Sequence, residues 1–260
     1  MTTSSTPATV PDLQIDGQIA ILRLRRPEQA NRLELRDLEA LQQHFRRLSA
    51  QPSEVRALVV TGTGKHFSAG FDLGAIDSAV EGDASQIFAA VVDAIEGLPQ
   101  ITICALNGGV FGGSTDLALA CDIRLGVPEM RMFMPAARFG LHYYESGLRR
   151  YLTRLGLDNA KRLCLLAEEF DASALQQMGY LTHIVPAESL MDEALALARR
   201  ATAMAPLARA NMKAALNAMA AGRYDPEEGS RGYAACMASA DLQEGIAALR
   251  EKREPKFEGR

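Results

Sequence analysis

Residues 64–73 read Gly-Lys-His-Phe-Ser-Ala-Gly-Phe-Asp-Leu and directly follow the apolar run Ala-Leu-Val-Val-Thr-Gly at 57–62. A short continuous apolar run that ends in a turn signal is typical of a strand buried on both faces. Three small residues of the turn let another group approach its backbone closely: Ser68, Ala69 and Gly70. If a short helix opens directly afterwards, the N–H of Phe71 lies near its start, where backbone donors lack a partner within the helix. A tight turn without any ligand stays an alternative for this stretch by itself.

A second glycine-rich turn, Asn-Gly-Gly-Val-Phe-Gly-Gly-Ser-Thr-Asp at 107–116, follows the apolar run at 101–106. Gly112 and Gly113 stand where a helix of small residues begins, which again predicts a free backbone N–H. The G-x-G-x-x-G spacing of a dinucleotide site and the Gly-Lys-Ser/Thr of a phosphate loop are both absent. A hydrolase with a nucleophile elbow would need Gly-x-Ser-x-Gly, which is absent too. Two such turns suggest two N–H donors that converge on one oxygen, which is an oxyanion hole.

Strands and helices alternate over the first part of the chain, which predicts an α/β fold. The expected strands are 19–24, 57–62, 101–106 and 123–125, and the expected helices are 35–48, 85–98 and 113–121. Beyond about residue 155 the strand signals fade, and helices are expected at 159–168, 171–178, 190–204 and 241–252. The chain is therefore divided into a disordered tail (1–14), an α/β core (15–195) and a helical C-terminal region (196–260).

Charge and composition exclude several classes of protein. The formal net charge of −4 argues against nucleic acid or an anionic membrane as the main partner. No stretch approaches the roughly 18 apolar residues of a membrane span, and the N-terminus lacks the pattern of a signal peptide, so a cytoplasmic protein is expected. The cysteines and histidines are scattered, which predicts buried reduced thiols and no metal site.

Both turns resemble the paired signatures of the crotonase (enoyl-CoA hydratase/isomerase) superfamily, F-x-A-G-x-D-L and N-G-x-x-x-G-G-G-x-E-L-A-L-A-C-D. The matching stretches here are 67–73 and 107–122. Arg-Pro-Glu-Gln-Ala-Asn at 26–31 is similar to the family's R-P-E-A-x-N, and the segments 174–186 and 244–257 resemble its later motifs. The resemblance therefore covers the chain from about residue 15 to 259, and it is far more specific than either glycine turn alone.

The resemblance implies a spiral of ββα units, a helical trimerisation region, and a homotrimer or a dimer of trimers. It implies an acyl-CoA thioester substrate from fatty acid metabolism, with coenzyme A as part of the substrate and no separate cofactor. The thioester oxygen would be held by the N–H groups of Phe71 and Gly113. The implied substrate contacts are Gln29, Ala30, Arg32, Ser68, Ala69, Gly70, Phe71, Asp72, Leu73, Phe111, Gly112, Gly113, Pro135 and, across a subunit boundary, Lys252 and Phe257.

Acid–base chemistry is where the sequence departs from the family pattern. Family hydratases use two glutamates; the first position is Asp116 here, which is shorter by one methylene, and the second is Ala136, which has no carboxylate. In the loop 140–147, Gly-Leu-His-Tyr-Tyr-Glu-Ser-Gly, Glu145 falls where some family members place a working carboxylate. We therefore expect Glu145 to be the main acid/base and Asp116 its partner.

Other roles for these side chains stay open. Tyr143 or His142 could donate a hydrogen bond or close the pocket, and Tyr143 could equally be only a pocket wall. Asp116 could pair within its helix, and Glu145 could point to solvent or pair with a nearby arginine. Hydration or double-bond isomerisation is the first hypothesis for the reaction. Decarboxylation, C–C hydrolysis, thioester hydrolysis or dehalogenation, and a catalytically silent acyl-CoA-binding protein, are the alternatives.

Overall fold

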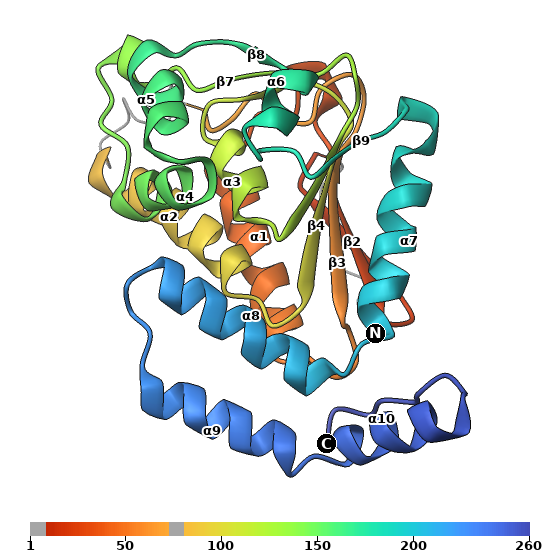
Figure 1. Cartoon of the computed structure of the whole chain (residues 1–260). Helices are drawn as coiled ribbons and strands as arrows, with labels where there is room; N and C mark the ends of the chain where they lie inside the picture. The colour runs from red at the N-terminus through yellow and green to blue at the C-terminus, as the bar shows by residue number, and fades with distance from the viewer. Residues whose placement is uncertain (1–8, 73–80) are drawn as a thin grey trace.

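The computed structural model describes residues 9–72 and 81–260, and a six-stranded sheet forms its centre (Figure 1). The order of its strands is β1 (Asp12–Asp16), β2 (Ile19–Leu24), β3 (Ala57–Gly62), β4 (Ile101–Leu106), β6 (Ile123–Gly126) and β9 (His183–Ile184). Only β1 pairs antiparallel, and the other neighbours are parallel. A smaller three-stranded sheet consists of β5 (Val110–Phe111), β7 (Arg131–Phe133) and β8 (Phe170–Asp171).

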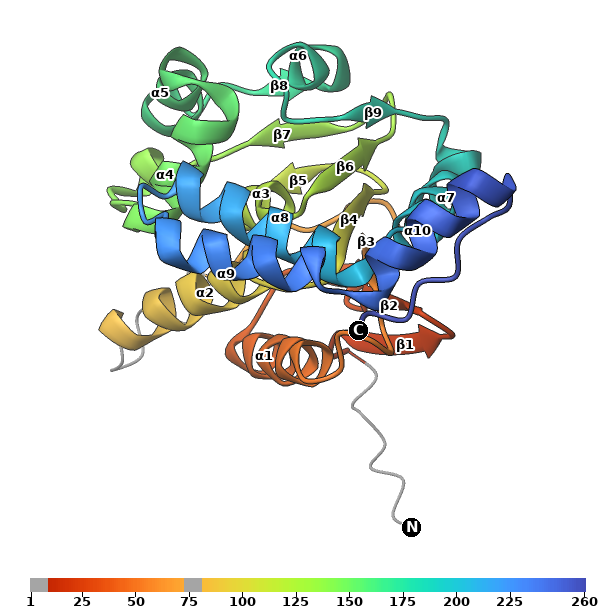
Figure 2. The ribbon, with the colours of Figure 1, turned by 60° about the horizontal axis from the view of Figure 1, so that its bottom comes forward.

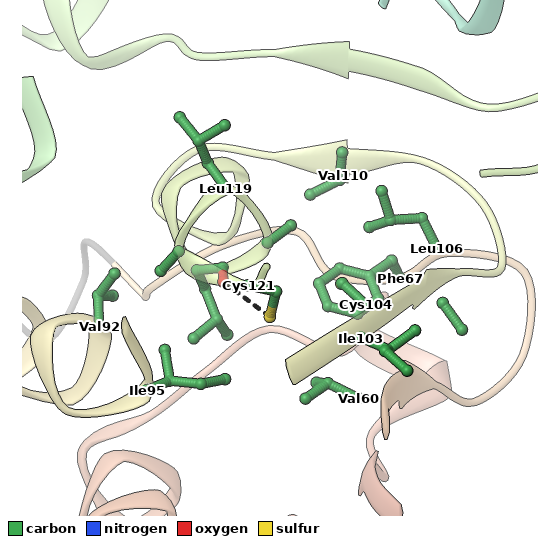
Figure 3. Packing of buried hydrophobic residues seen from close by; sticks show 14 of the residues in the cluster. Val60, Phe67, Val92, Ile95, Ile103, Cys104, Leu106, Val110, Leu119 and Cys121 are labelled. Carbon is green, nitrogen blue, oxygen red and sulfur yellow. Dashed lines mark hydrogen bonds between the residues drawn. The ribbon is translucent and has the colours of Figure 1, made fainter. Parts of the chain in front are cut away.

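Helices cover both faces of the large sheet, which explains why β3 and β4 are almost wholly buried and apolar. On one face lie α1 (Leu35–Ser49), α2 (Glu81–Glu96) and α3 (Ser114–Ala120), and on the other lies α7 (Leu190–Thr202) (Figure 1). Figure 3 shows the core between β4 and the helices α2 and α3, where Cys104 and Cys121 lie among aliphatic side chains. All four cysteines are free thiols; these two are buried as predicted, whereas Cys164 and Cys236 are half-buried.

The register of β3 and β4 brings the two glycine-rich turns to the same end of the sheet, where the carboxyl ends of these two strands lie. Val60 pairs with Cys104 and Thr61 with Ala105 in a parallel ladder. Both strands therefore end at the same level, and the chain leaves each of them directly into a glycine turn. The order of strands and turns predicted from the sequence therefore places the two glycine-rich turns next to each other.

The second half of the chain is mainly helical. Two layers lie outside the large sheet: α4 (Glu145–Leu155), α5 (Leu157–Leu166) and α6 (Ala172–Gln177), and then α8 (Pro206–Ala220), α9 (Pro226–Met237) and α10 (Ala240–Glu251). Short 3-10 turns are η1 (Pro27–Gln29), η3 (Ala136–Phe139) and η4 (Ala187–Ser189). Figure 2 shows α8 and α9 side by side, with α10 beyond them. None of the helices in the described ranges is both long and apolar enough to span a bilayer.

Two predicted boundaries were wrong, and a third prediction lies outside the described residues. The strand β1 begins at Asp12, so residues 12–14 belong to the sheet rather than to a tail. The boundary at 195/196 cuts through α7, which packs on β3 and β4 and therefore belongs to the core. The helix expected directly after residue 72 falls on residues that the structure does not describe.

Candidate active site

The two glycine-rich turns are bound to each other. The N–H of Phe111 donates to the carbonyl of Ser68 at 2.9 Å, and the N–H of Phe67 donates to the carbonyl of Gly109 at 3.0 Å. The hydroxyl of Ser114 donates to the hydroxyl of Ser68 at 2.6 Å, and both side chains are fully buried. These bonds hold the start of α3 against the first turn.

A glycine is required where the turns approach most closely. Gly70 has a φ of +94°, and a Cβ at this position would lie 2.7 Å from the carbonyl oxygen of Phe111 and 3.1 Å from the nitrogen of Gly113. Both neighbours are backbone atoms that cannot rotate away. Residues with a side chain are therefore excluded at position 70, both by the positive φ and by the close contact between the two turns.

Each turn leaves one backbone N–H without an acceptor. In the part of the chain that the structure describes, neither Phe71 nor Gly113 donates a backbone hydrogen bond, whereas the flanking amides of Asp72 and Gly112 donate to carbonyls at 2.9 and 3.1 Å. Phe71 and Gly113 both line a cavity of about 440 Å³. Both residues are half-buried at the cavity wall, and two unpaired donors on adjoining turns there indicate a site for an oxygen atom.

The cavity is mainly apolar. Its described lining residues are Ala69, Phe71, Ser85, Phe88, Phe111, Gly112, Gly113, Phe133, Met134, Pro135, Ala136, Phe139, Leu141, His142, Tyr143 and Tyr144. Aromatic rings form much of the wall, and none of these side chains is a carboxylate. Such a cavity suits an apolar ligand that carries one polar group. Within residues 9–72 and 81–260, no cluster of three or more His, Cys, Asp or Glu side chains is placed to hold a metal ion.

Asp116 lies behind the cavity wall and is fully buried. Its two carboxylate oxygens accept from the guanidinium of Arg150, from Nε at 2.8 Å and from Nη2 at 2.9 Å. Oδ2 also accepts from the hydroxyl of Tyr144 at 2.5 Å. A bidentate pair with an added phenol donor is among the strongest arrangements for a buried carboxylate. The structure thus pairs Asp116 with α4, and Tyr144 separates it from the cavity.

Arg150 joins three helices through its ion pairs. Besides Asp116 on α3, its Nη1 contacts Asp93 at 2.7 Å and Glu96 at 3.1 Å, both on α2, while its own side chain is fully buried in α4. Burial by itself would lower the pKa of Arg150, but the hydrogen bond and charge of Asp116 raise it above its usual value. The guanidinium therefore remains charged and fixes the helices around the site.

Tyr143 and Tyr144 stack on each other at the inner end of the loop, with ring centroids 4.4 Å apart. The hydroxyl of Tyr143 lies 3.4 Å from that of Tyr144. Burial first, and the charge of Asp116 second, raise the pKa of both phenols well above the usual tyrosine value. Both are therefore neutral hydroxyls around neutral pH.

Glu145 does not join the cavity-lining residues. It is exposed, begins α4, and lines a second, larger and more polar cavity between α2, α4 and α8. An acidic side chain in the first turn of a helix is stabilised by the helix dipole, which gives this residue a local role. His142, in contrast, is exposed at the rim of the apolar cavity and lines it.

The predicted coenzyme A contacts differ in where the structure places them. Ala69, Phe71, Phe111, Gly112, Gly113 and Pro135 line the cavity. Ser68, Gly70 and Asp72 belong to the first turn, and Gln29, Ala30 and Arg32 lie beside it: Ala30 accepts from the N–H of Ala69 at 2.7 Å, and Arg32 pairs with Asp72 at 3.3 Å. Leu73 lies outside the described residues. Lys252 and Phe257 follow α10 and do not line the cavity of their own chain, so their contact across a subunit boundary stays a prediction.

Sequence reasoning did not assign a site role to Arg150 or Glu96. Arg150 is one of the arginines near Glu145 in the sequence, and Glu96 is 53 positions or more from the arginines it binds, Arg149, Arg150 and Arg154. A buried arginine on an otherwise amphipathic helix could have signalled a carboxylate partner, but not which one. Asn31, which hydrogen-bonds three backbone groups of the surrounding turns, belongs to the motif that the resemblance had marked.

The ion pairs of Glu96 predict a pH dependence of stability. Burial raises the pKa of this carboxyl, but its bonds and charges from Arg149, Arg150 and Arg154 outweigh burial and lower the pKa below its usual range. A pKa that is lower in the folded state stabilises the fold above the unfolded pKa, and the contribution is lost as pH falls through the folded value. We expect the difference in unfolding free energy between wild type and Glu96→Gln to be largest at neutral pH and to shrink below about pH 4. Urea titrations at several pH values measure it, and a difference that is independent of pH would contradict it.

Comparison with known proteins agrees with the motifs and the fold. The sequence profile of the family "Enoyl-CoA hydratase/isomerase" matches residues 14–260. "Probable enoyl-CoA hydratase echA6" of Mycobacterium leprae is 31% identical over 95% of this chain and 98% of its own, and the "Short-chain-enoyl-CoA hydratase" of Clostridium acetobutylicum is 28% identical over 95% and 96%. The crystal structure of the enoyl-CoA hydratase from Bacillus anthracis superposes with a TM-score of 0.88 at 27% identity, covering 96% of this chain and 99% of that one. The predicted crotonase-like α/β fold is thereby confirmed, and the chain belongs to the enoyl-CoA hydratase/isomerase family of the crotonase superfamily.

Proposed function

We propose that this enzyme binds an acyl-CoA thioester and converts its acyl group through an enolate whose oxygen is held by the N–H groups of Phe71 and Gly113. The observation that carries the proposal is the pair of unpaired donors on adjoining turns, both on residues that line one apolar cavity. The enoyl-CoA hydratase/isomerase relatives support the substrate class.

Two donors aimed at one oxygen act on charge that develops during the reaction. Removal of an α-proton moves negative charge onto the thioester oxygen, and a single preorganised donor commonly contributes about 10²–10³ in rate. The aromatic walls exclude water, which strengthens these hydrogen bonds. Space of about 440 Å³ and the rings of Phe88, Phe111 and Phe133 favour an apolar acyl group.

The lining favours double-bond isomerisation over hydration. Hydration needs side chains that hold and activate a water molecule, and Ala136 stands at the position of the second hydratase glutamate. Isomerisation needs only one group that removes a proton and returns it to another carbon. We propose His142 and the tyrosines at the cavity as the groups that handle protons, with Asp116 as their carboxylate; Glu145, in its exposed position, is not part of this proposal.

Binding without turnover is the second candidate, and a specific observation favours it. Asp116, a buried carboxylate beside the cavity, is engaged by Arg150 on both oxygens and also accepts from the hydroxyl of Tyr144. A protein with this arrangement could hold a CoA ester in the oxyanion hole and leave it unchanged. The other reactions named above would use the same oxyanion hole and differ in the acyl group.

Assembly as a trimer, or as a dimer of trimers, belongs to the same proposal. Met212, Leu216 and Met219 are exposed on α8, and Tyr233 and Met237 are exposed on α9, so these helices present apolar surface that a second copy would cover. Lys252 and Phe257 would then reach coenzyme A bound to a neighbouring subunit. We further propose a cytoplasmic enzyme of fatty acid metabolism, with no partner among nucleic acids or membranes.

The proposal is tested by incubating the protein in D₂O with crotonyl-CoA and, separately, with a 3-enoyl-CoA, and following both esters by mass spectrometry. We expect deuterium uptake or movement of the double bond in the 3-enoyl ester, because the enolate exposes both carbons to proton exchange. Glu145→Gln is measured in parallel: loss of exchange in this variant would return Glu145 to the acid/base role.

Binding is measured separately so that the two candidates are distinguished. Tight binding of both CoA esters by calorimetry, with neither deuterium uptake nor isomerisation, would contradict the enzymatic proposal and support a silent acyl-CoA-binding protein. Formation of 3-hydroxyacyl-CoA faster than isomerisation would instead favour hydration.

A further inference from the structure

We propose that Tyr144 carries the proton between the acyl group and the buried carboxylate of Asp116, so that the phenol extends Asp116 into the cavity. This inference rests on the proposed enolate function and names the side chain that performs its proton step. Tyr144 would be the catalytic residue because it faces the substrate, and Asp116 a positioning residue because it acts through Tyr144.

The geometry places these groups in a row. Tyr144 lines the apolar cavity, and its hydroxyl donates to Oδ2 of Asp116 at 2.5 Å. Asp116 itself is 0% exposed and does not line the cavity. Among the described residues, the phenol of Tyr144 both lines the cavity and donates to this carboxylate, so it offers a route for a proton between the two. The hydroxyl of Tyr143 lies 3.4 Å from the hydroxyl of Tyr144 and donates to it.

Arg150 holds the carboxylate of Asp116 in place. It holds both oxygens of Asp116, and its other ion pairs with Asp93 and Glu96 anchor it to α2. Because the carboxylate cannot rotate, Oδ2 stays directed at Tyr144. The ring is held as well, by stacking on Tyr143 and by an edge contact with Phe88 at 6.2 Å between centroids. A fixed donor–acceptor pair is what a proton relay requires.

The step balances as a relay. The α-carbon gives its proton to the phenol oxygen, while the phenol's own proton moves to Oδ2 of Asp116. The electron pair of the broken C–H bond forms the enolate double bond, and the carbonyl π pair moves to the oxygen between Phe71 and Gly113. In the second half of the isomerisation, Asp116 returns its proton to the phenol, and the phenol gives its own proton to the γ-carbon. Tyr144 begins and ends as a neutral phenol, in accord with the raised pKa that burial and Asp116 give it.

Tyr144→Phe tests the relay because it removes only the hydroxyl. We expect about a 10²-fold loss of deuterium exchange into the 3-enoyl-CoA, the lower end of the contribution of a general acid–base group, with the dissociation constant of the ester unchanged. Tyr180→Phe is the control that also removes only a hydroxyl: Tyr180 is fully buried, its hydroxyl donates to the carbonyl of Thr115 at 2.8 Å, and it does not line the cavity. This control is expected to retain wild-type exchange.

A carboxylate introduced on another wall of the cavity shows whether the loss of exchange in Tyr144→Phe comes from the missing proton carrier or from altered packing. Ala136 lines the cavity, so Ala136→Glu places a carboxylate there without using Asp116. In the Tyr144→Phe background we expect this second change to recover exchange by tenfold or more. Asp116→Asn should lose exchange as Tyr144→Phe does while still binding the ester; if that variant does not fold, Tyr144→Phe decides by itself.

Two results for Tyr144→Phe would overturn the relay, and one result for the wild-type protein would overturn the proposed function. Wild-type exchange that persists unchanged in Tyr144→Phe would overturn the relay and leave the enolate function standing. Weaker ester binding in Tyr144→Phe, in proportion to the loss of exchange, would also overturn it, because the tyrosine would then be a packing group. Absence of exchange in the wild-type protein would reject the proposed function itself.

Discussion

Gly70→Ala is expected to reduce deuterium exchange into an acyl-CoA thioester by about 10³-fold or more, since it disturbs both proposed oxyanion donors, and one such donor commonly contributes about 10²–10³. The new methyl group would lie 2.7 Å from the carbonyl of Phe111 and 3.1 Å from the nitrogen of Gly113. These are backbone atoms of the second turn, so the turns have to move apart. The two N–H groups would then no longer converge on one oxygen. Exchange rates measured at saturating ester test this prediction.

Gly17→Ala provides the control for backbone strain. Gly17 also has a positive φ, +55°, but a Cβ there meets no atom within 4 Å, and it lies in the turn between β1 and β2. Both variants pay for the left-handed conformation, whereas only Gly70→Ala separates the turns. We therefore expect Gly17→Ala to keep its activity. Equal losses of activity in the two variants would mean that strain, rather than the contact between the turns, is responsible.

Arg150→Met is expected to lower the free energy of unfolding by about 3–5 kcal/mol, which is the usual effect of removing one partner of a buried ion pair. Arg150 and Asp116 are both 0% exposed, so the substitution leaves a buried carboxylate with Tyr144 as its remaining side-chain donor. Glu96 keeps two arginines, and Asp93 is half-exposed, so their losses are smaller. Urea unfolding at a fixed protein concentration measures the change.

A double variant shows whether the unpaired charge causes the loss. Replacing both partners, Arg150→Met with Asp116→Leu, removes the buried charge altogether and is expected to recover most of the stability, because apolar replacement of a buried pair is often neutral. Arg231→Met is the surface control, since Arg231 is 68% exposed and its ion pair with Glu227 spans 4.0 Å. A loss below about 1 kcal/mol for Arg150→Met would contradict the prediction, because that is the range of exposed pairs.

The fold was predictable from sequence where local pattern and burial agree. The apolar runs at 57–62 and 101–106 became β3 and β4, and the spacing of Leu38, Leu41 and Phe45 became the buried face of α1. Strand β1 was not predicted, because Asp12–Asp16 is half-exposed at the sheet edge and carries little apolar signal. The short strands β8 and β9 have two residues each, too few to show any period.

The site was predictable only where backbone conformation determines it. Glycine at positions 70 and 112 follows from the positive φ of each turn, which a sequence motif can record. Tertiary packing decides which residues at the start of a helix face the cavity. Tyr144 and Glu145 are adjacent in the sequence, yet Tyr144 lines the apolar cavity whereas Glu145 is exposed. The pairing of Asp116 with Arg150 spans 34 positions and could not be read from spacing.

Helix α3 begins directly after Gly113 and carries Asp116 at its third position. One rigid turn thus bears the donor proposed for the thioester oxygen and the carboxylate behind Tyr144, so a small displacement of α3 shifts both. Substitutions at the two places are therefore expected to be non-additive, with an interaction energy in a double-mutant cycle, as is found for residues that share one structural element. For engineering, affinity for the enolate and the rate of proton movement in this protein are not independent variables.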